Sequence, residues 1–315
     1  MARATFLLPA AERFGAQRLS TTCATALGRA DRTPVDEPGR RAQLLRHFDL
    51  PEGTWPIAAL SRQADVGDAA GAAWLRADPA YLRADINGVR LLAHGDALAL
   101  TDADRDALLP ALKPLFGDAG FALDAPTPSR WYLRLAREAK LPAFADPGDA
   151  LGDDIFEHLD SSFEARRWRT LSNEVQVILH NHPWNEARAA QGKPPVNALW
   201  FWGSGTLPDA RIDTHSWHAI ACTDDPTAHA LAAIACSVAP LPPRYPSGSD
   251  DLLFDLTATR DLAWLEREWL LPALDALRRG EIDVLELDGE DGRVFCIGRW
   301  HRLRFWRKPL TRLDG

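Results

Sequence analysis

The residues best suited to chemistry lie in one stretch, residues 173–205, where a helical pattern gives way to a polar turn. If Pro183 opens a short helix, their spacing places Asn185 and Arg188 on one face. An arginine can bind a phosphate or carboxylate with two hydrogen bonds, and asparagine adds another donor. Asn197 stands at the start of the next strand pattern. These residues predict a site for an anionic group; in the alternative, the asparagines satisfy backbone groups of a long turn and Arg188 pairs with a surface acid.

The strand after this motif offers a wall for such a ligand. Trp200 and Trp202 share one face because strand side chains alternate, and the glycine-flanked turn that follows could present backbone N–H groups to a phosphate. A covered central strand with a structural turn explains the same residues. The predicted ligand site comprises Asn185, Arg188, Asn197, Trp200, Trp202, Gly203, Ser204 and Gly205.

Two histidine clusters have the chemistry of metal ligands. They are His180-x-His182 and Asp213-x-His215-x-x-His218. Two imidazoles and a carboxylate suffice for a three-ligand zinc site with an open position. The spacing is loose, however, and nothing in the sequence brings the two clusters together. We therefore expect no metal and no cofactor, and these five residues are the candidates if a metal does bind.

The sequence lacks the short motifs that identify common catalytic sites. It contains no G-x-x-x-x-G-K-[ST] or G-x-G-x-x-G nucleotide fingerprint, and Ser204 lacks the G-x-S-x-G pattern of a nucleophile elbow. No catalytic residue is predicted.

A mixed α/β framework must position these residues. Its middle part predicts a β-β-α-β-β module, with strands at residues 72–77, 89–93, 121–123 and 131–135 and a helix that Thr101 caps. Strands and helices alternate further along, with strands at 198–202, 217–222 and 252–256, a helix at 262–279 and a hairpin at 283–297.

Three regions follow from this pattern. Residues 1–70 are expected to pack on the C-terminal domain, residues 71–140 form the small α+β module, and residues 141–315 form an α/β domain that carries the N-x-x-R-x-x-x-G-x-x-x-x-N motif. The predicted fold is therefore a C-terminal layered α/β domain with the small module inserted in it or preceding it.

Composition limits the class of partner. The net charge of -8 argues against broad nucleic-acid binding. No apolar run approaches the roughly 20 residues that span a bilayer, and the four cysteines are too dispersed for a zinc ribbon or a disulfide framework. The basic and aromatic residues at 299–308 could bind single-stranded nucleic acid or guard an edge strand. We expect a cytoplasmic bacterial protein that binds a small anion, without a membrane or nucleic-acid partner.

The run H-P-x-N-x-x-R-x-x-x-G-x-x-P-x-N-x-L-W-x-W-G-x-G, from His182 to Gly205, resembles the bacterial regulatory proteins of the RpfE type. Residues 74–92 (WLRADPAYLRADINGVRLL), 130–135 (RWYLRL) and 304–309 (RFWRKP) resemble the same family. Its name implies a role in regulating pathogenicity factors and leaves the biochemical activity open.

The N-x-x-R-x-x-x-G-x-x-x-x-N element is also similar to one in archaeal-type cofactor-independent phosphoglycerate mutases. That resemblance implies an alkaline-phosphatase-like scaffold with two metals and a Ser or Thr nucleophile. The early D-G-x-x-D and late D-x-x-x-H-x-G-D ligand patterns are missing from this sequence. We therefore predict a non-enzymatic regulatory or ligand-sensing protein on this scaffold; the alternative is a metal-dependent phosphohydrolase or phosphomutase acting on a small phosphorylated metabolite.

Overall fold

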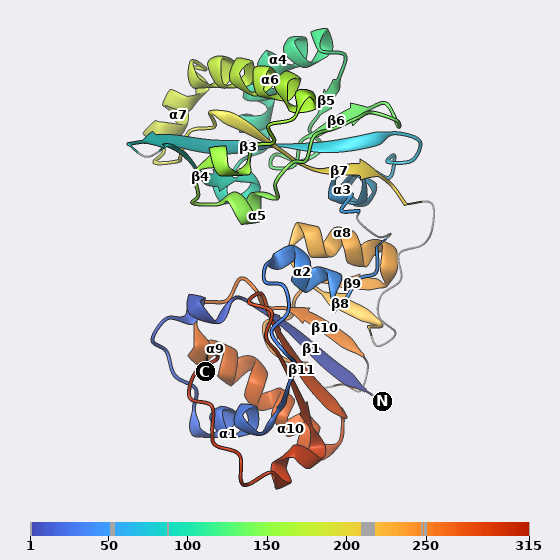
Figure 1. The fold of residues 1–315 in the computed structure, drawn as a ribbon, viewed down its shortest axis with the longest axis vertical. Coiled ribbons are helices and arrows are strands. Elements are labelled where there is room, and N and C mark those ends of the chain that lie inside the picture. Colours follow the sequence, from blue (N-terminus) through green and yellow to red (C-terminus); the bar gives the residue numbers. More distant parts are fainter. Residues whose placement is uncertain are drawn as a thin grey trace. The chain divides into compact units, whose positions relative to one another are not determined.

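The computed structural model describes residues 2–50, 54–86, 88–208, 218–246, 248 and 251–314. The chain forms two compact units. Unit 1 comprises Met1–Leu50 and Ala210–Gly315, and unit 2 comprises Pro51–Asp209. Unit 2 is thus inserted into the sequence of unit 1. Both units combine sheets with helices, which confirms the predicted mixed α/β class (Figure 1).

A seven-stranded sheet forms the centre of unit 1 (Figure 1). From one edge to the other, its strands are β2 (Asp31–Arg32), β12 (Val294–Gly298), β11 (Val284–Gly289), β1 (Arg3–Leu8), β10 (Leu252–Asp255), β8 (Ile220–Cys222) and β9 (Ser237–Ala239). The five strands from β11 to β9 run parallel, while β12 pairs antiparallel with both of its neighbours, β11 and β2. The first strand of the chain is therefore central and lies between two strands from the C-terminal part.

Helices of unit 1 connect these strands. They are α1 (Thr21–Arg29), α2 (Arg40–Leu45), α8 (Pro226–Ala235), α9 (Leu262–Leu265) and α10 (Leu271–Arg279), and short 3-10 turns occur at Ala11–Phe14 (η1) and Arg299–Leu303 (η5). A π-helical turn, Glu266–Leu270, joins α9 to α10 without a break. Asp225 caps α8 through the backbone N–H of Ala228, and Pro226 starts the helix, as its sequence predicts.

Aromatic side chains fill the core of unit 1. Trp269 on the π-helical turn is fully buried, and its ring meets those of Phe6 and Phe254 edge-on, with centroids 5.6 and 5.1 Å apart. Edge-to-face pairs of this kind add to the stabilisation from burial alone. The helix thereby fixes the two central strands β1 and β10.

Unit 2 is built around one long strand. β3 (Ala73–Asp85) pairs along one edge with β7 (Ala198–Thr206), while β6 (Tyr132–Leu135) and β4 (Gly88–His94) share its other edge. β5 (Ala122–Asp124) pairs with β6, and every strand pair in this sheet is antiparallel.

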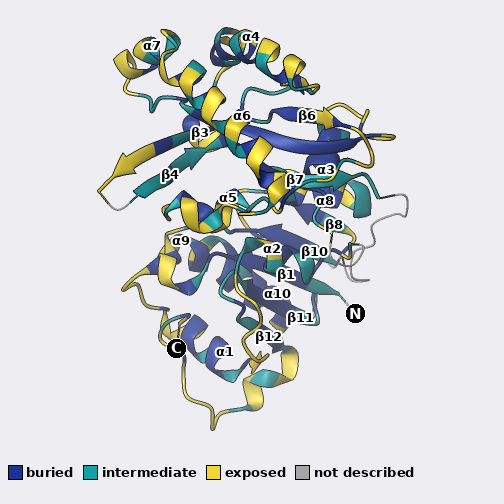
Figure 2. Ribbon diagram, turned by 45° about the horizontal axis from the view of Figure 1, so that its top comes forward, coloured by how far each residue is buried: buried dark blue, intermediate teal, exposed yellow. Residues whose placement is uncertain are grey.

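Helices cover the sheet of unit 2, and Figure 2 shows their buried and exposed faces. They are α3 (Ile57–Asp65), α4 (Asp102–Asp118), α5 (Pro147–Ala150), α6 (Phe163–His180) and α7 (Trp184–Ala190), with 3-10 turns at Gly95–Leu98 (η2) and Ile155–His158 (η3). Thr101 and Asp104 form a capping box at the start of α4, as predicted for Thr101. Trp168 of α6 packs against Phe201 of β7 with ring centroids 5.2 Å apart.

The unit boundaries differ from those drawn on the sequence. Residues 141–209 were expected in the C-terminal α/β domain, yet they belong to unit 2, because β7 pairs with β3 and α6 packs on the same sheet. The N-x-x-R motif therefore lies in unit 2 together with the β-β-α-β-β module. Residues 1–50 are part of unit 1, whereas residues 54–70 belong to unit 2.

We predict that Trp269→Ala lowers the free energy of unfolding by about 3–5 kcal/mol, because it leaves a cavity between β1 and β10. Trp306→Ala is the matched control, since that side chain is 68% exposed, and we expect a change within about 0.5 kcal/mol. Urea unfolding followed by circular dichroism measures both. Equal effects of the two substitutions would contradict this account of the core.

Candidate functional site

Polar side chains gather at the carboxyl edge of the parallel strands in unit 1. Asp255 is the last residue of β10, Thr223 directly follows β8, and Asp288 is the penultimate residue of β11. Their neighbours place these carboxyl ends side by side, because β1 pairs with both β10 and β11. Ligands of open α/β sheets bind outside this edge. Topology therefore makes it the candidate functional site.

The first part of the site is a buried carboxylate held by an arginine. Asp255 accepts hydrogen bonds from the hydroxyls of Thr223 (2.9 Å) and Thr257 (2.6 Å) and forms an ion pair with Arg40. The same guanidinium nitrogen of Arg40 lies 3.3 Å from a carboxylate oxygen of Asp225. Burial acts to raise the pKa of Asp255, but Arg40 and the threonine hydroxyls outweigh it and hold that pKa below its ordinary value.

The second part is a chain of ring and carboxylate groups at the end of β11. Arg46 binds Asp288 with two hydrogen bonds, from Nε at 2.9 Å and from Nη2 at 2.6 Å. Nε2 of His47 lies 2.7 Å from the same carboxylate, and Nδ1 of His47 lies 3.2 Å from Nε2 of His218. Burial acts to raise the pKa of Asp288, yet the hydrogen bonds from Arg46 and His47 lower it overall. The two imidazoles and the carboxylate thus form one connected polar chain.

This arrangement balances the charge of its carboxylates with protein cations. Arg40 neutralises Asp255, and Arg46 neutralises Asp288. A divalent cation at Asp255 would compete with the Arg40 guanidinium for the same oxygens. Among the described residues, no group of three or more His, Cys, Asp or Glu side chains has an arrangement that could hold a metal ion.

Three of the five candidate metal ligands lie in the described part of the chain. His180 ends α6 in unit 2, and Nδ1 of His182 accepts a hydrogen bond from the backbone N–H of Trp184. His218 belongs to unit 1, where it contacts His47. Asp213 and His215 lie outside the described residues. His218 is therefore the one candidate of the five that the structure places in the polar cluster at the sheet edge.

The two asparagines of the predicted ligand site bind the chain's own backbone. Asn185 donates to the carbonyls of Leu179 (2.8 Å) and Val196 (2.9 Å) and accepts from the N–H of Val196 (2.9 Å). Asn197 accepts from the N–H of Leu82 and donates to its carbonyl, at 2.8 and 2.7 Å. These contacts favour the alternative in which both asparagines fix a long turn, and anion binding by them stays a prediction.

Arg188 is a buried structural group. Its side chain is 1% exposed, and its Nη1 lies 2.9 Å from the carboxylate of Asp104. Nε donates to the carbonyl of Pro194 at 3.0 Å, and Nη2 donates to that of Leu98 at 2.8 Å. The acid that pairs with Arg188 is thus a buried capping residue of α4 and not a surface group.

Trp202 belongs to a buried charge network in unit 2. Its indole N–H donates to Asp78 at 2.8 Å, and Asp78 binds Arg76 with two hydrogen bonds of 2.9 and 2.7 Å. The Arg76 guanidinium carbon lies 5.1 Å from the centroid of Trp202 and 5.3 Å from that of Tyr132. Trp202 is therefore a partner of a buried ion pair.

Trp200 and the glycines after Trp202 have different surroundings. Trp200 donates to the carbonyl of Ala145 at 3.0 Å and borders a largely apolar cavity of about 280 Å³ in unit 2. Gly203, Ser204 and Gly205 lie within β7, where the sequence suggested a turn. Gly203 has a φ of +65°, and the pairing of β7 with β3 shifts register there, which is typical of a β-bulge.

Comparison with known proteins shows partial similarity to one group of enzymes. No protein-family model matches the chain. Over 62 residues it is 42% identical to a probable 2,3-bisphosphoglycerate-independent phosphoglycerate mutase of Geobacter sulfurreducens, and 36% identical to the mutase of Methanosarcina barkeri. In both cases the match covers 20% of this chain and spans only 16% of the mutase. The chain is thus distantly similar to these mutases, and no comparison supports the RpfE-type resemblance.

Two solved structures resemble the whole chain. The PH0037 protein from Pyrococcus horikoshii aligns with a TM-score of 0.51 at 15% identity, over 94% of this chain and 87% of that one. The cofactor-independent phosphoglycerate mutase from Thermoplasma acidophilum aligns with a TM-score of 0.44 at 16% identity, over 95% and 90%. At such identity the likeness to PH0037 concerns the fold alone.

Sequence reasoning missed most of the sheet-edge cluster, namely Arg40, Arg46, His47, Asp255 and Asp288. A signal for part of it was present. The strand predicted at residues 252–256 contains Asp255 close to its carboxyl end, where parallel strands place ligand-binding groups. Arg40 begins α2 and His47 follows it by two residues, and nothing in the local sequence indicates that these side chains reach that edge.

We predict that Arg188→Ala lowers the free energy of unfolding by about 3–5 kcal/mol, because it leaves the buried carboxylate of Asp104 without its cation. Arg166→Ala, at an exposed position of α6, is the control and should change stability by less than about 0.5 kcal/mol. Chemical denaturation tests both. A stable Arg188→Ala protein that no longer binds inorganic phosphate would restore the ligand-binding interpretation.

A second prediction concerns pH. The pKa of Asp288 is lower in the folded chain than its ordinary value near 4, so the ionised form stabilises the fold. This contribution is complete above about pH 5 and is lost as pH falls through about 4 toward the folded-state pKa. Asp288→Asn removes it, so the stability difference between the two proteins should narrow from pH 7 to pH 3. Denaturation midpoints across that range measure the difference, and exposed Asp275→Asn should leave the pH profile unchanged.

Proposed function

We propose that this chain is a non-enzymatic regulatory or ligand-sensing protein built on a phosphoglycerate-mutase-like scaffold. The observation that carries the proposal is the position of Arg40, whose guanidinium contacts both Asp225 and Asp255 at the carboxyl edge of the sheet. The regulatory part of the proposal rests on the sequence resemblance of residues 182–205 to RpfE-type proteins alone, which no comparison supports. The mutases are named for phosphoglycerate, and a sensor related to them would bind a small phosphorylated anion.

The charge balance at the sheet edge supports this proposal. Two-metal phosphoryl transfer requires carboxylates and imidazoles that are free to hold two cations about 4 Å apart. Asp255 and Asp288 each bind an arginine, and His47 lies against Asp288. Releasing Asp255 for a metal would break its ion pair with Arg40 and leave the guanidinium only the longer contact with Asp225 among these acids, which is unfavourable.

The second candidate is a metal-dependent phosphohydrolase or phosphomutase acting on a small phosphorylated metabolite. The contact between His47 and His218 beside Asp288 favours it, because imidazoles and a carboxylate at this edge are suitable ligands for a transition metal. The similarity to the mutases points in the same direction.

The two candidates differ in metal binding, and Arg40 gives the sharpest test. We predict that the wild-type protein binds no Mn²⁺ in the micromolar range, as measured by calorimetric titration after chelation. Arg40→Ala should lose about 3 kcal/mol or more of stability, because Asp255 loses its buried cation. Added Mn²⁺ should then raise the melting temperature of the variant, since a cation can replace the guanidinium.

Arg41→Ala is the matched control, because Arg41 is the exposed residue next to Arg40 on α2, whereas Asp225 and Asp255 form their ion pairs with Arg40. Its response to Mn²⁺ should equal that of the wild type. The proposal fails if the purified wild-type protein holds one or two equivalents of metal and releases phosphate from p-nitrophenyl phosphate. Loss of that activity in His218→Ala would establish the enzyme instead.

A further inference from the structure

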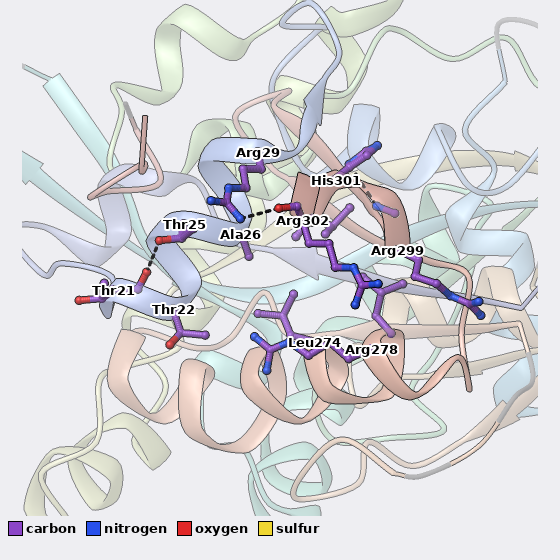
Figure 3. A pocket seen from close by; sticks show the side chains of 13 residues that line it. Thr21, Thr22, Thr25, Ala26, Arg29, Leu274, Arg278, Arg299, His301 and Arg302 are labelled. Atoms are coloured by element: carbon purple, nitrogen blue, oxygen red, sulfur yellow. Dashed lines mark hydrogen bonds between the residues drawn. The ribbon is translucent and has the colours of Figure 1, made fainter. Parts of the chain in front are cut away.

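Unit 1 contains a cavity that lies away from the polar cluster at the carboxyl edge. It has a volume of about 330 Å³ and is enclosed by α1, α10, the end of β12 and the 3-10 turn η5 (Figure 3). Gly298 borders it and pairs with Val284, the first residue of β11. The cavity is therefore beside the amino edge of the parallel strands, whereas Asp255 and Asp288 are at their carboxyl edge.

Arginines surround this cavity. Arg29 comes from α1, Arg278 from α10, and Arg299 and Arg302 from η5 (Figure 3). No aspartate or glutamate is among the described residues that line it. One acid, Asp275, pairs with Arg278 at 2.7 Å, and both of these side chains are more than half exposed. In a chain with a net charge of -8, such a concentration of positive charge indicates an anionic ligand.

The cavity also has donors in fixed positions. Arg29 donates from Nη1 to the backbone carbonyl of Arg302 at 2.8 Å, which ties α1 to η5. Its Nε is buried and has no hydrogen-bond partner among the described atoms. Thr21, Thr22 and Thr25 line the same space, and the Thr25 hydroxyl donates to the backbone carbonyl of Thr21 at 2.7 Å (Figure 3). Because the contact with Arg302 holds the Arg29 guanidinium in place beside the cavity, the side chain is ordered in advance for binding a phosphate.

The floor of the cavity is apolar. Ala26, Leu274, Leu277 and Ile297 contribute to its lining. A ligand that fills the space must therefore present an apolar portion as well as charge, because hydrated inorganic phosphate gains nothing from such a surface.

Large apolar side chains are exposed on the same segment. Trp300 and Leu303 of η5, followed by Phe305 and Trp306, are 57–80% exposed. Trp300 directly follows Arg299, and Leu303 directly follows Arg302, the two arginines of this segment that line the cavity. Aromatic side chains beside basic residues are typical of surfaces that meet the boundary of a lipid layer.

We propose that this cavity binds a phosphate group attached to an apolar body, with Arg29, Arg278 and Arg302 holding the phosphate. The source of that group is either a soluble phosphate monoester or the headgroup of an anionic phospholipid. The proposal does not depend on whether the carboxyl edge of the sheet catalyses a reaction, since the two sites lie at opposite edges.

Calorimetric titration of the full chain with hexyl phosphate tests the site, with hexanol and inorganic phosphate as reference ligands. Hexyl phosphate should bind at least about tenfold more tightly than either reference, since it alone satisfies both the arginines and the apolar floor. Arg278→Gln and Arg302→Gln should each weaken its binding by about tenfold or more. Arg279→Gln is the matched control, because Arg279 is the next residue, is similarly exposed and also pairs with an acid, Glu281.

A further variant separates the apolar floor from the charge. Ala26→Leu narrows the cavity without removing an arginine. This substitution should weaken the binding of hexyl phosphate and leave the melting temperature within a few degrees of that of the wild type. Unchanged affinity in Ala26→Leu, Arg278→Gln and Arg302→Gln together would overturn the proposal, as would failure of the wild type to prefer hexyl phosphate.

Vesicles distinguish the two sources. Sedimentation with phosphatidylcholine vesicles that contain phosphatidic acid, inhibited by hexyl phosphate and reduced in Trp306→Ala, would identify a lipid headgroup. Binding of hexyl phosphate without vesicle binding would identify a soluble ester. If the protein binds a single-stranded oligonucleotide more tightly than hexyl phosphate and the vesicles, the proposal is contradicted. The basic segment would then be a binding surface for nucleic acid.

Discussion

Buried arginine–aspartate pairs determine how this protein uses its polar interior. Arg40 and Asp255 hold the ends of α2 and β10 in unit 1, and Arg188 and Asp104 hold α7 and α4 in unit 2. A buried carboxylate without a cation would be strongly destabilising, so each pair must form for its neighbourhood to fold. The cost of burying these charges is compensated only when helix and strand reach their native positions together. Each ion pair therefore stabilises the fold only when the two elements that carry its residues are packed in their native positions.

This constraint connects the scaffold with the proposed function. A parallel sheet places its strand ends at one edge, and enzymes exploit that edge for catalysis. In this chain two acids at that edge, Asp255 and Asp288, form ion pairs with Arg40 and Arg46. The sheet therefore has the usual arrangement of strand ends, but arginines of the same chain balance the charge of these carboxylates. The likeness to mutases and a role in binding are therefore compatible. A separate group of arginines lines the cavity at the amino edge, where no acid is among the described lining residues.

Local sequence patterns predicted helices and strands well, but they could not predict which residues far apart in the sequence pair with one another. The Thr101 cap and the start of α8 at Asp225-Pro226 follow from side chains within one helical turn. The polar motif around Arg188 was recognised, but its spacing could not reveal that Asp104, far earlier in the chain, is its partner. Tertiary packing buries Arg188 of the predicted anion site, while Asn185 and Asn197 are half-buried, and anion binding there stays a prediction. In the same way, the pattern at residues 141–209 gave no sign that β7 pairs with β3.

The insertion of unit 2 has a consequence for the order of folding. β1 is synthesised first, yet both of its partners, β10 and β11, lie near the end of the chain. All of unit 2 emerges between them, and its strands pair within residues 73–206. A growing chain can therefore complete unit 2 while the apolar strand Arg3–Leu8 still has neither neighbour. Contacts of such long range form slowly, so β1 is exposed to wrong pairing and to chaperones until β10 and β11 have been synthesised.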